Sequence, residues 1–197
     1  MNWLQWRLEL NIMKHWTIFF ILVALWLPAA WAQTAGSSPS NPALPGTTVS
    51  GIVECGEGYT SHELYDMKIT VLELIRGEEA WNRIREADPA NVAAPEGKEY
   101  VLVRVKFEYY ARGVPGLCIH PLIPDQFTAY SAGGEGYETV PVVTPKPELR
   151  KKLKSGESAE GWIVFAVSKK DKAPLIHYSA DTGGAVQHGG GKWFRLQ

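Results

Sequence analysis

The sequence predicts an all-β domain, an antiparallel β-sandwich with one short helix inserted near 78–87, and three observations lead to this prediction. Several segments alternate apolar and polar residues with the period of two that is typical of a half-buried strand. Clusters rich in glycine, proline and small polar residues separate these segments at short intervals. A single segment instead spaces its apolar residues as an amphipathic helix does. Short strands with one helical insert are typical of a sandwich.

Residues 1–32 have the features of a secretory signal peptide and are set aside before the fold is considered. The uninterrupted apolar run, residues 18–27, has the length of a signal-peptide core and is too short for a comfortable membrane span. Pro28 ends this run, and residues 30–32, Ala-Trp-Ala, match the small-x-small pattern of a cleavage site. We therefore expect an exported protein, periplasmic or extracellular, that is cleaved after residue 32 and keeps no stable membrane span. Met13 is an alternative start of translation, and an uncleaved N-terminal anchor is the alternative fate of this segment.

Residues 33–46 are rich in Ser, Pro, Gly and Ala, a composition that predicts a flexible linker. The domain itself is then expected to cover 47–197. Hydrophobic residues make up 45% of the sequence and charged residues 21%, which is the balance of an ordinary globular protein. The formal net charge of −1 gives no general attraction to nucleic acid or to an anionic membrane. Nucleic acid is therefore not expected as a partner.

The clearest expected strand is 98–110, in which every second residue from Val101 to Tyr109 is apolar and charged residues take positions between them. Residues 160–168 are apolar on both faces, which predicts a strand in the middle of a sheet. Residues 133–136, Gly-Gly-Glu-Gly, are typical of a hairpin turn between two strands. In chain order the expected strands are 47–53, 66–75, 98–110, 126–132, 137–143, 160–168, 174–180 and 192–197.

The stretch 75–88, IRGEEAWNRIREAD, predicts a short amphipathic helix between two strands. Glu78 and Glu79 stand in its first turn, where the helix dipole favours negative charge. Trp81 and Ile84 belong to an apolar stripe at helical spacing. About 10 residues are too few for a helix that is stable alone, so this one needs a surface to pack on. Either Trp81 and Ile84 cover one open end of the sandwich, or Trp81 is the anchor of a partner-binding helix.

Several of these elements occur together in an order that resembles a known family. Gly77 precedes the helix that carries Trp81, and a proline-containing loop leads into Glu-Gly-Lys-Glu-Tyr at 96–100 and the long alternating strand. Further on, Gly156 precedes Gly-Trp-Ile-Val-Phe at 161–165. This combination resembles a bacterial domain family of unknown function with a telokin-like, immunoglobulin-like fold, whose members are typically secreted or lipid-anchored.

The resemblance covers about 47–180 and implies an immunoglobulin-like (telokin-like) antiparallel β-sandwich in an envelope or secreted protein. The family brings no established catalytic residues, so none is carried over to this chain. The sequence departs from the family because it lacks a lipobox and has two cysteines within the domain.

Motifs that would carry chemistry are weak in this sequence. Residues 62–66, His-Glu-Leu-Tyr-Asp, begin like the zinc-protease motif His-Glu-x-x-His, but the fifth residue is Asp and the segment leads into a strand. The remaining histidines have no spacing typical of metal ligands. Neither a nucleophile elbow nor a phosphate-binding loop is present. The sequence therefore predicts no catalytic residue, no metal and no cofactor, and a protein that is not an enzyme.

The cysteines of the sequence are Cys55 and Cys118, and both lie in the part expected to be exported. An even count in an oxidising compartment favours a disulfide. Each cysteine stands at the end of an expected strand, where two loops can meet at one pole of a sandwich. Two separate thiols are the alternative.

Aromatic residues recur in the expected strands, and most of them are expected to belong to the core. Where some are exposed on one sheet, they offer a surface for a carbohydrate or a peptide. The sequence does not decide which ones these are. The residues are Tyr100, Tyr109, Tyr110, Phe127, Tyr130 and Tyr137.

The function that these observations favour is an exported, non-catalytic immunoglobulin-like module for binding or adhesion. Its partner is an unknown protein or glycan in the bacterial envelope or outside the cell. Two alternatives remain open: a small extracytoplasmic hydrolase with an unrecognised site, and a structural envelope subunit that docks by edge-strand addition.

Overall fold

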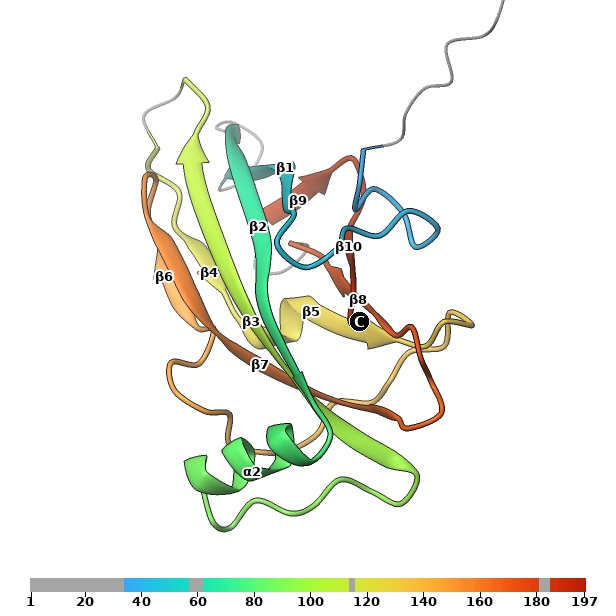
Figure 1. Ribbon diagram of the computed structural model, residues 1–197. Coiled ribbons are helices and arrows are strands. Elements are labelled where there is room, and N and C mark those ends of the chain that lie inside the picture. The colour runs from blue at the N-terminus through green and yellow to red at the C-terminus, as the bar shows by residue number, and fades with distance from the viewer. Residues whose placement is uncertain (1–33, 57–61, 114–115, 181–184) are drawn as a thin grey trace, which may run out of the picture. The chain divides into compact units, whose positions relative to one another are not determined.

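The computed structural model describes residues 34–56, 62–113, 116–180 and 185–197, and most of these belong to antiparallel strands (Figure 1). The elements in chain order are β1 Thr48–Gly56, β2 His62–Arg76, α2 Glu78–Ala87, β3 Lys98–Ala111, β4 His120–Leu122, the 3-10 helix η1 Pro124–Gln126, β5 Phe127–Tyr130, β6 Lys151–Leu153, β7 Ser158–Ser168, β8 Leu175–Tyr178, β9 Ala185–His188 and β10 Lys192–Arg195. The predicted signal peptide, 1–32, lies outside the described residues and stays a prediction.

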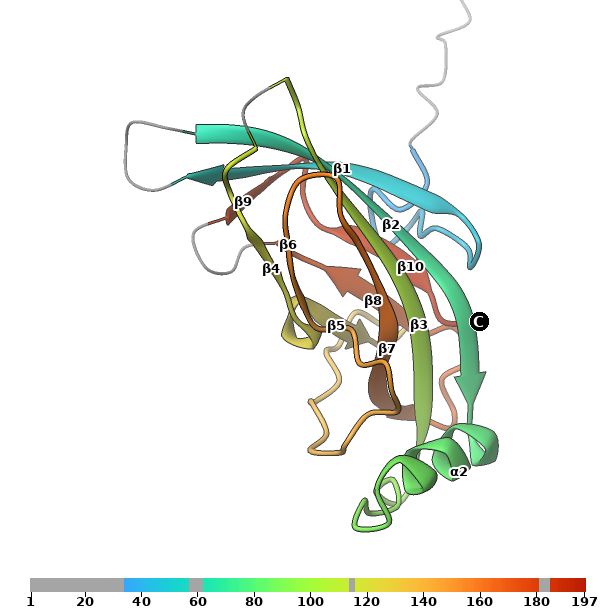
Figure 2. The ribbon, with the colours of Figure 1, turned by 90° about the vertical axis from the view of Figure 1, so that its left-hand side faces the viewer.

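The described residues form three antiparallel sheets. The largest has the strand order β7-β3-β2-β1-β9, the second has the order β10-β8-β5, and β4 pairs with β6. Figures 1 and 2 show the long strands of the first sheet on one side, with the shorter strands of the other two against one of its faces. Within the described residues, the predicted all-β antiparallel architecture with one α-helix is therefore confirmed at this level.

The main core lies between the sheets, and β3 shows why the sequence forms it. The apolar residues at every second position from Val101 to Tyr109 are at most 1% exposed and belong to this core. Phe127, Ile176 and Phe194 enter the same core from the three-stranded sheet. Because strand side chains alternate between faces, this period-two pattern places one whole face of β3 in the interior.

Helix α2 covers the other face of the large sheet. Ala80 and Ile84 are fully buried there, in a second and smaller core that includes Tyr100 and Leu102 of β3. The helix has the predicted bounds, but it lies on the outer face at one end of the long strands instead of closing the gap between the sheets (Figure 2). Among the described residues, no helix has the length and apolar content needed to cross a membrane.

Strand β7 stands at the edge of the large sheet, where the sequence predicted a central strand. It is buried on both faces because Ile163 belongs to the main core and Trp162 to the core under α2. Its outer edge is paired as well, since the N–H of Trp162 donates to the carbonyl of Pro147 (2.8 Å). A Cβ at Gly161 would stand 2.6 Å from the backbone of residues 148–149, so glycine permits this approach. An apolar strand therefore does not have to be central.

Residues 34–46 are part of the domain and not a free linker. The N–H of Ala43 donates to the carbonyl of Trp193, and the N–H of Arg195 donates to the carbonyl of Ala43, each at 2.9 Å. Ala43 is fully buried beside β10. The prediction of a flexible linker was wrong because Ser- and Pro-rich composition reports the lack of an apolar pattern, whereas this segment is held by its backbone. The ordered domain thus extends to residue 34.

Residues 138–143, predicted as part of a strand, form none. The hairpin is present, but its second arm ends early, with the N–H of Tyr137 donating to the carbonyl of Ala129 (2.8 Å). The chain then crosses towards α2, where Asn91 exchanges two hydrogen bonds with the backbone of Val143. Alternation of apolar residues at 140 and 142 reflects their packing against the core under α2.

Candidate functional site

A cluster of three aromatic side chains lies on the outward face of the three-stranded sheet. Tyr130 comes from β5, His177 from β8 and Trp193 from β10. Their neighbours along each strand, Ala129, Ile176 and Phe194, belong to the main core. Because successive strand residues point to opposite faces, the three rings point away from that core, and all three are partly exposed.

The rings of Tyr130 and Trp193 converge above the central strand. Their strands are separated by β8, so their backbones are about 10 Å apart at ordinary strand spacing. The ring centroids are nevertheless only 5.3 Å apart. His177 supports this arrangement from β8, because its ring centroid is 4.4 Å from that of Trp193. The two outer rings therefore lean towards each other across β8.

A groove of about 430 Å³ opens beside these two rings. Leu175, Tyr130 and Trp193 line it, one wall is formed by residues 39–40, and the other by the turn at 131–134. The volume lies within the usual range of small-molecule sites, roughly 300–1,000 Å³. The groove thus joins the N-terminal segment, the hairpin turn and the aromatic cluster in one place.

The wall formed by the hairpin turn is fixed by hydrogen bonds. One carboxylate oxygen of Asp171 accepts from the N–H of Ala132 (3.2 Å) and from the hydroxyl of Tyr137 (2.8 Å). Burial and this hydrogen bond to Asp171 raise the pKa of Tyr137 above its usual range. The N–H of Gly134 donates to the carbonyl of Ser131 (2.9 Å), which closes the turn.

The opposite wall is fixed in a similar way. The N–H of Trp193 donates to the carbonyl of Gly36 (2.9 Å), and the N–H of Gly36 donates to the carbonyl of Asn41 (2.7 Å). Gly36 has φ +82°, and a Cβ there would stand 2.8 Å from the side chain of Val49. Both walls are therefore held by the domain itself, which makes the groove preformed.

The chemistry of the groove is apolar with a few hydrogen-bonding groups. Within the described part of the chain, neither the indole N–H of Trp193 nor the hydroxyl of Tyr130 has a hydrogen-bond partner. Ser40 and Ser131 add hydroxyls from the two walls, and no Asp, Glu, Lys, Arg or His is among the described residues that line the groove. Such a surface can pack against an apolar ligand face while offering donors at its edge.

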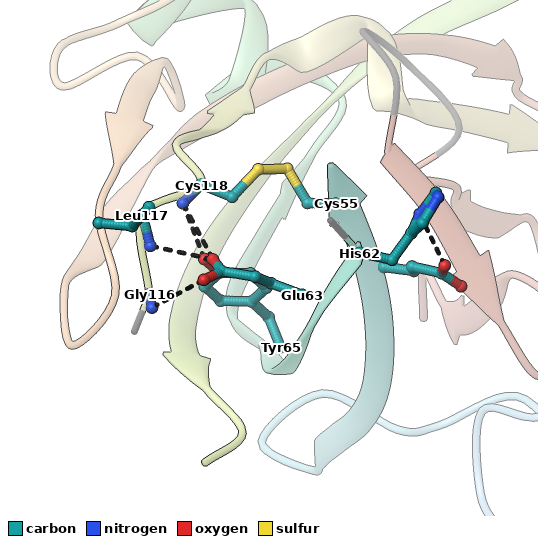
Figure 3. Close-up of a disulfide and its surroundings, with 8 residues drawn as sticks. Cys55, His62, Glu63, Tyr65, Gly116, Leu117 and Cys118 are labelled. Atoms are coloured by element: carbon teal, nitrogen blue, oxygen red, sulfur yellow. Dashed lines mark hydrogen bonds and ion pairs between the residues drawn. A yellow bond between two sulfur atoms is a disulfide. The ribbon is translucent and has the colours of Figure 1, made fainter. Parts of the chain in front are cut away.

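Cys55 and Cys118 form the disulfide that the cysteine count predicts, with their Cα atoms 6.2 Å apart (Figure 3). Next to it, the Glu63 carboxylate accepts from the backbone N–H groups of Gly116 (3.3 Å), Leu117 (2.9 Å) and Cys118 (3.3 Å). The hydroxyl of Tyr65 also donates to Glu63, and this bond, together with the backbone ones, lowers the pKa of the carboxyl group. Glu63 thus anchors the loop that carries Cys118.

The zinc-protease-like residues lie on a strand, because β2 begins at His62. The carboxylate of Glu54 contacts His62 with one oxygen (2.8 Å) and His188 with the other (2.6 Å). These are cross-strand pairs on β1, β2 and β9. Among the described residues, no group of three His, Cys, Asp or Glu side chains is arranged to hold a metal ion.

Trp81 is half-buried, unlike its helix neighbour Ile84. Its ring stacks on Tyr100 with a centroid distance of 5.9 Å, and its open side lines a pocket of about 360 Å³ with Glu78 and Lys98. The structure therefore gives Trp81 a packing role and leaves part of it accessible. Its role as a partner-binding residue stays a prediction.

His177 and Trp193 are members of the cluster that the sequence did not single out. Alternation in 192–197 places Trp193 and Phe194 on opposite faces of the same strand. If Phe194 is in the core, Trp193 therefore faces outward. What the sequence lacks is the strand register, because Trp193 meets His177 and Tyr130 only through the β10-β8-β5 pairing.

No family model matches the chain, and no curated protein matches it. Among solved structures, the chain is similar to a proposed lipoprotein, ycdA, from Bacillus subtilis subsp. subtilis str. 168, with a TM-score of 0.46 and 12% sequence identity. The similarity covers 66% of this chain and 36% of that one. A likeness this distant carries no functional information, so the site is interpreted from its own residues.

Proposed function

We propose that the protein is an exported, non-catalytic binding module and that the groove beside Tyr130 and Trp193 is its ligand site. One observation carries this proposal: two partly exposed aromatic rings converge over a preformed groove of about 430 Å³. Tyr and Trp suit ligand surfaces because each combines a large apolar ring with one polar group. Fixed walls support the same function, because a preorganised site loses little entropy when a ligand binds.

Export and the finer fold type are part of the same proposal. The signal-like N-terminus and the Cys55–Cys118 disulfide support an oxidising compartment, the bacterial envelope or the outside of the cell. Antiparallel sheets that enclose a shared core support an immunoglobulin-like sandwich.

Binding is favoured over hydrolysis by the composition of the groove. Among the described lining residues, the serine hydroxyls of Ser40 and Ser131 have no histidine or carboxylate beside them, and a serine nucleophile needs an adjacent base. Docking by strand addition is less favoured, because three outer edges are already paired: β7 by 147–149, β10 by Ala43, and β5 by Tyr137.

Retention of the purified, disulfide-bonded protein on isolated envelope material tests this function. We expect Trp193→Ala to lower retention at least about tenfold, as for loss of a central aromatic contact. Tyr110→Ala is the matched control, because Tyr110 is an exposed tyrosine on β3 outside the groove lining, and it should bind as the unmodified protein does. Equal retention of folded Trp193→Ala and Tyr110→Ala would contradict the proposal.

A further inference from the structure

We infer that the ligand of the groove is a neutral carbohydrate whose sugar ring packs against Tyr130 and Trp193. This inference rests on the proposed function, because it names the ligand class of that same site. Three features of the groove carry this inference: the uncharged lining among its described residues, the aromatic ring faces beside donors that have no partner in the described part of the chain, and the limited size of the groove.

The uncharged lining argues for a neutral ligand. A charged group that enters the groove loses hydration, and no lining side chain of opposite charge replaces it. Asp171, which stands behind the hairpin wall, already accepts from Ala132 and Tyr137. Arg195 lies two residues beyond Trp193 on the same face of β10, but it is outside the lining. Phosphorylated and strongly ionic ligands are therefore disfavoured.

The polar and apolar groups of the groove match the two sides of a sugar ring. A pyranose ring has a C–H face that packs on an aromatic ring and hydroxyls around its rim. Tyr130 and Trp193 provide ring surface, and their own O–H and N–H groups, which have no partner among the described residues, can bond such hydroxyls. Ser40 and Ser131 add two further hydroxyls at the walls, one on each side.

The shape of the groove disfavours an extended peptide. A peptide that adds as a strand needs an open sheet edge, and both edges of the three-stranded sheet are hydrogen bonded, β10 to Ala43 and β5 to Tyr137. A proline-rich helix needs a succession of aromatic pockets along its length. Here a single groove of about 430 Å³ lies between residues 39–40 and 131–134, a size that suits one or two sugar rings.

The test uses chemical removal of one ligand class at a time from the envelope material. Periodate oxidation, which opens sugar rings that carry neighbouring hydroxyls, should abolish retention of the protein, whereas protease digestion should leave retention unchanged. Neutral cello-, malto- and xylo-oligosaccharides, whose rings carry such neighbouring hydroxyls, are then added as competitors, with an oligogalacturonate and a polyproline peptide beside them. At least one neutral oligosaccharide should displace the protein from the envelope material. The Trp193→Phe variant keeps an aromatic ring, so the same oligosaccharide should displace it at concentrations within a few-fold of those for the unmodified protein.

The outcomes separate this inference from the function on which it rests. If folded Trp193→Ala binds the envelope normally, the groove is not the ligand site and both proposals fail. In a second outcome, Trp193→Ala loses binding, but protease and not periodate removes the target, or only the polyproline peptide competes. The groove is then still the ligand site, and the assignment of its ligand as a carbohydrate is wrong. Competition by oligogalacturonate alone also overturns the neutral ligand. Thermal unfolding of each variant confirms that it is folded before its binding is compared.

Discussion

The imidazole of His177 on β8 occupies the space that a side chain at Gly191 would need. A Cβ added at Gly191 would overlap the imidazole ring. His177 in turn lies against Trp193, with ring centroids 4.4 Å apart. Glycine at position 191 therefore leaves room for the ring of His177, which lies against the groove residue Trp193.

Gly191→Ala should displace His177 and, through it, the indole of Trp193. We expect weaker retention on envelope material, by roughly three- to tenfold, because a contact residue is moved and not removed. Gly190→Ala is the control: it is the neighbouring glycine, it has open space around its Cβ, and it strains only its own turn at φ +70°. Equal binding by the two variants would show that His177 does not position Trp193.

Removing the disulfide should lower the free energy of unfolding by about 4 kcal/mol. Cys55 and Cys118 are 63 residues apart in sequence, and the chain-entropy model gives this value for a loop of that size. Urea denaturation of Cys55→Ala/Cys118→Ala measures the change. The unmodified protein under reducing conditions serves as the control and should lose a similar amount. A loss below about 1 kcal/mol would mean that the hydrogen bonds of Glu63 hold the loop in place without the disulfide.

Stability should fall as the pH drops from about 6.5 towards 4, because of His120. This histidine is fully buried between aromatic rings, and burial lowers its pKa to about 4. In this window the unfolded chain binds a proton that the folded protein does not, so protonation favours unfolding. A shift of that size corresponds to roughly 3 kcal/mol once the pH is below 4.

Measuring the free energy of unfolding against pH for His120→Gln checks the assignment. The slope between pH 6.5 and 4.5 should flatten in this variant and persist in His188→Gln, a matched change at an exposed histidine. The lowered pKa of Glu63 acts in a lower pH range, because its stabilisation is lost only as the pH falls below the usual carboxyl pKa of 4.5. An unchanged slope in His120→Gln would refute the role of this residue.

The two interpretations of Trp81, core packing and partner binding, predict different losses of stability when its side chain is removed. Trp81 is half-buried against Tyr100, so Trp81→Ala should destabilise by about 2 kcal/mol, less than the 3–5 kcal/mol expected for a fully buried aromatic. Ile84→Ala, its fully buried neighbour, should cost about 2–5 kcal/mol. If Trp81→Ala changes stability by less than about 1 kcal/mol but loses a binding partner, Trp81 is a recognition residue.

The parts of the fold that the sequence predicts are those with a long and regular pattern. β3 repeats its apolar residues five times on one face, and α2 has both an apolar stripe and acidic residues in its first turn. Strands β4, β6 and β9 have three or four residues each, too few for a period to be recognised. Residues 34–46 dock through backbone hydrogen bonds, which leave no trace in composition.

The candidate site was predictable only in kind. The aromatic residues of the strands indicated a surface for a carbohydrate or a peptide, and Tyr130 was among them. Tyr130, His177 and Trp193 are far apart in sequence, and they meet because of strand register. A period of two gives the face of each strand but not which residues lie side by side, so the groove could not be located.

The indole N–H signals of the protein in solution test the central claim most directly. Beyond residue 32 the sequence has three tryptophans, Trp81, Trp162 and Trp193, so a ¹⁵N-labelled sample gives one indole signal for each. Titration with soluble fragments of the envelope should shift the Trp193 signal and leave the signals of Trp81 and Trp162 in place. A shift of the Trp81 signal with Trp193 unmoved would contradict the account and assign binding to helix α2.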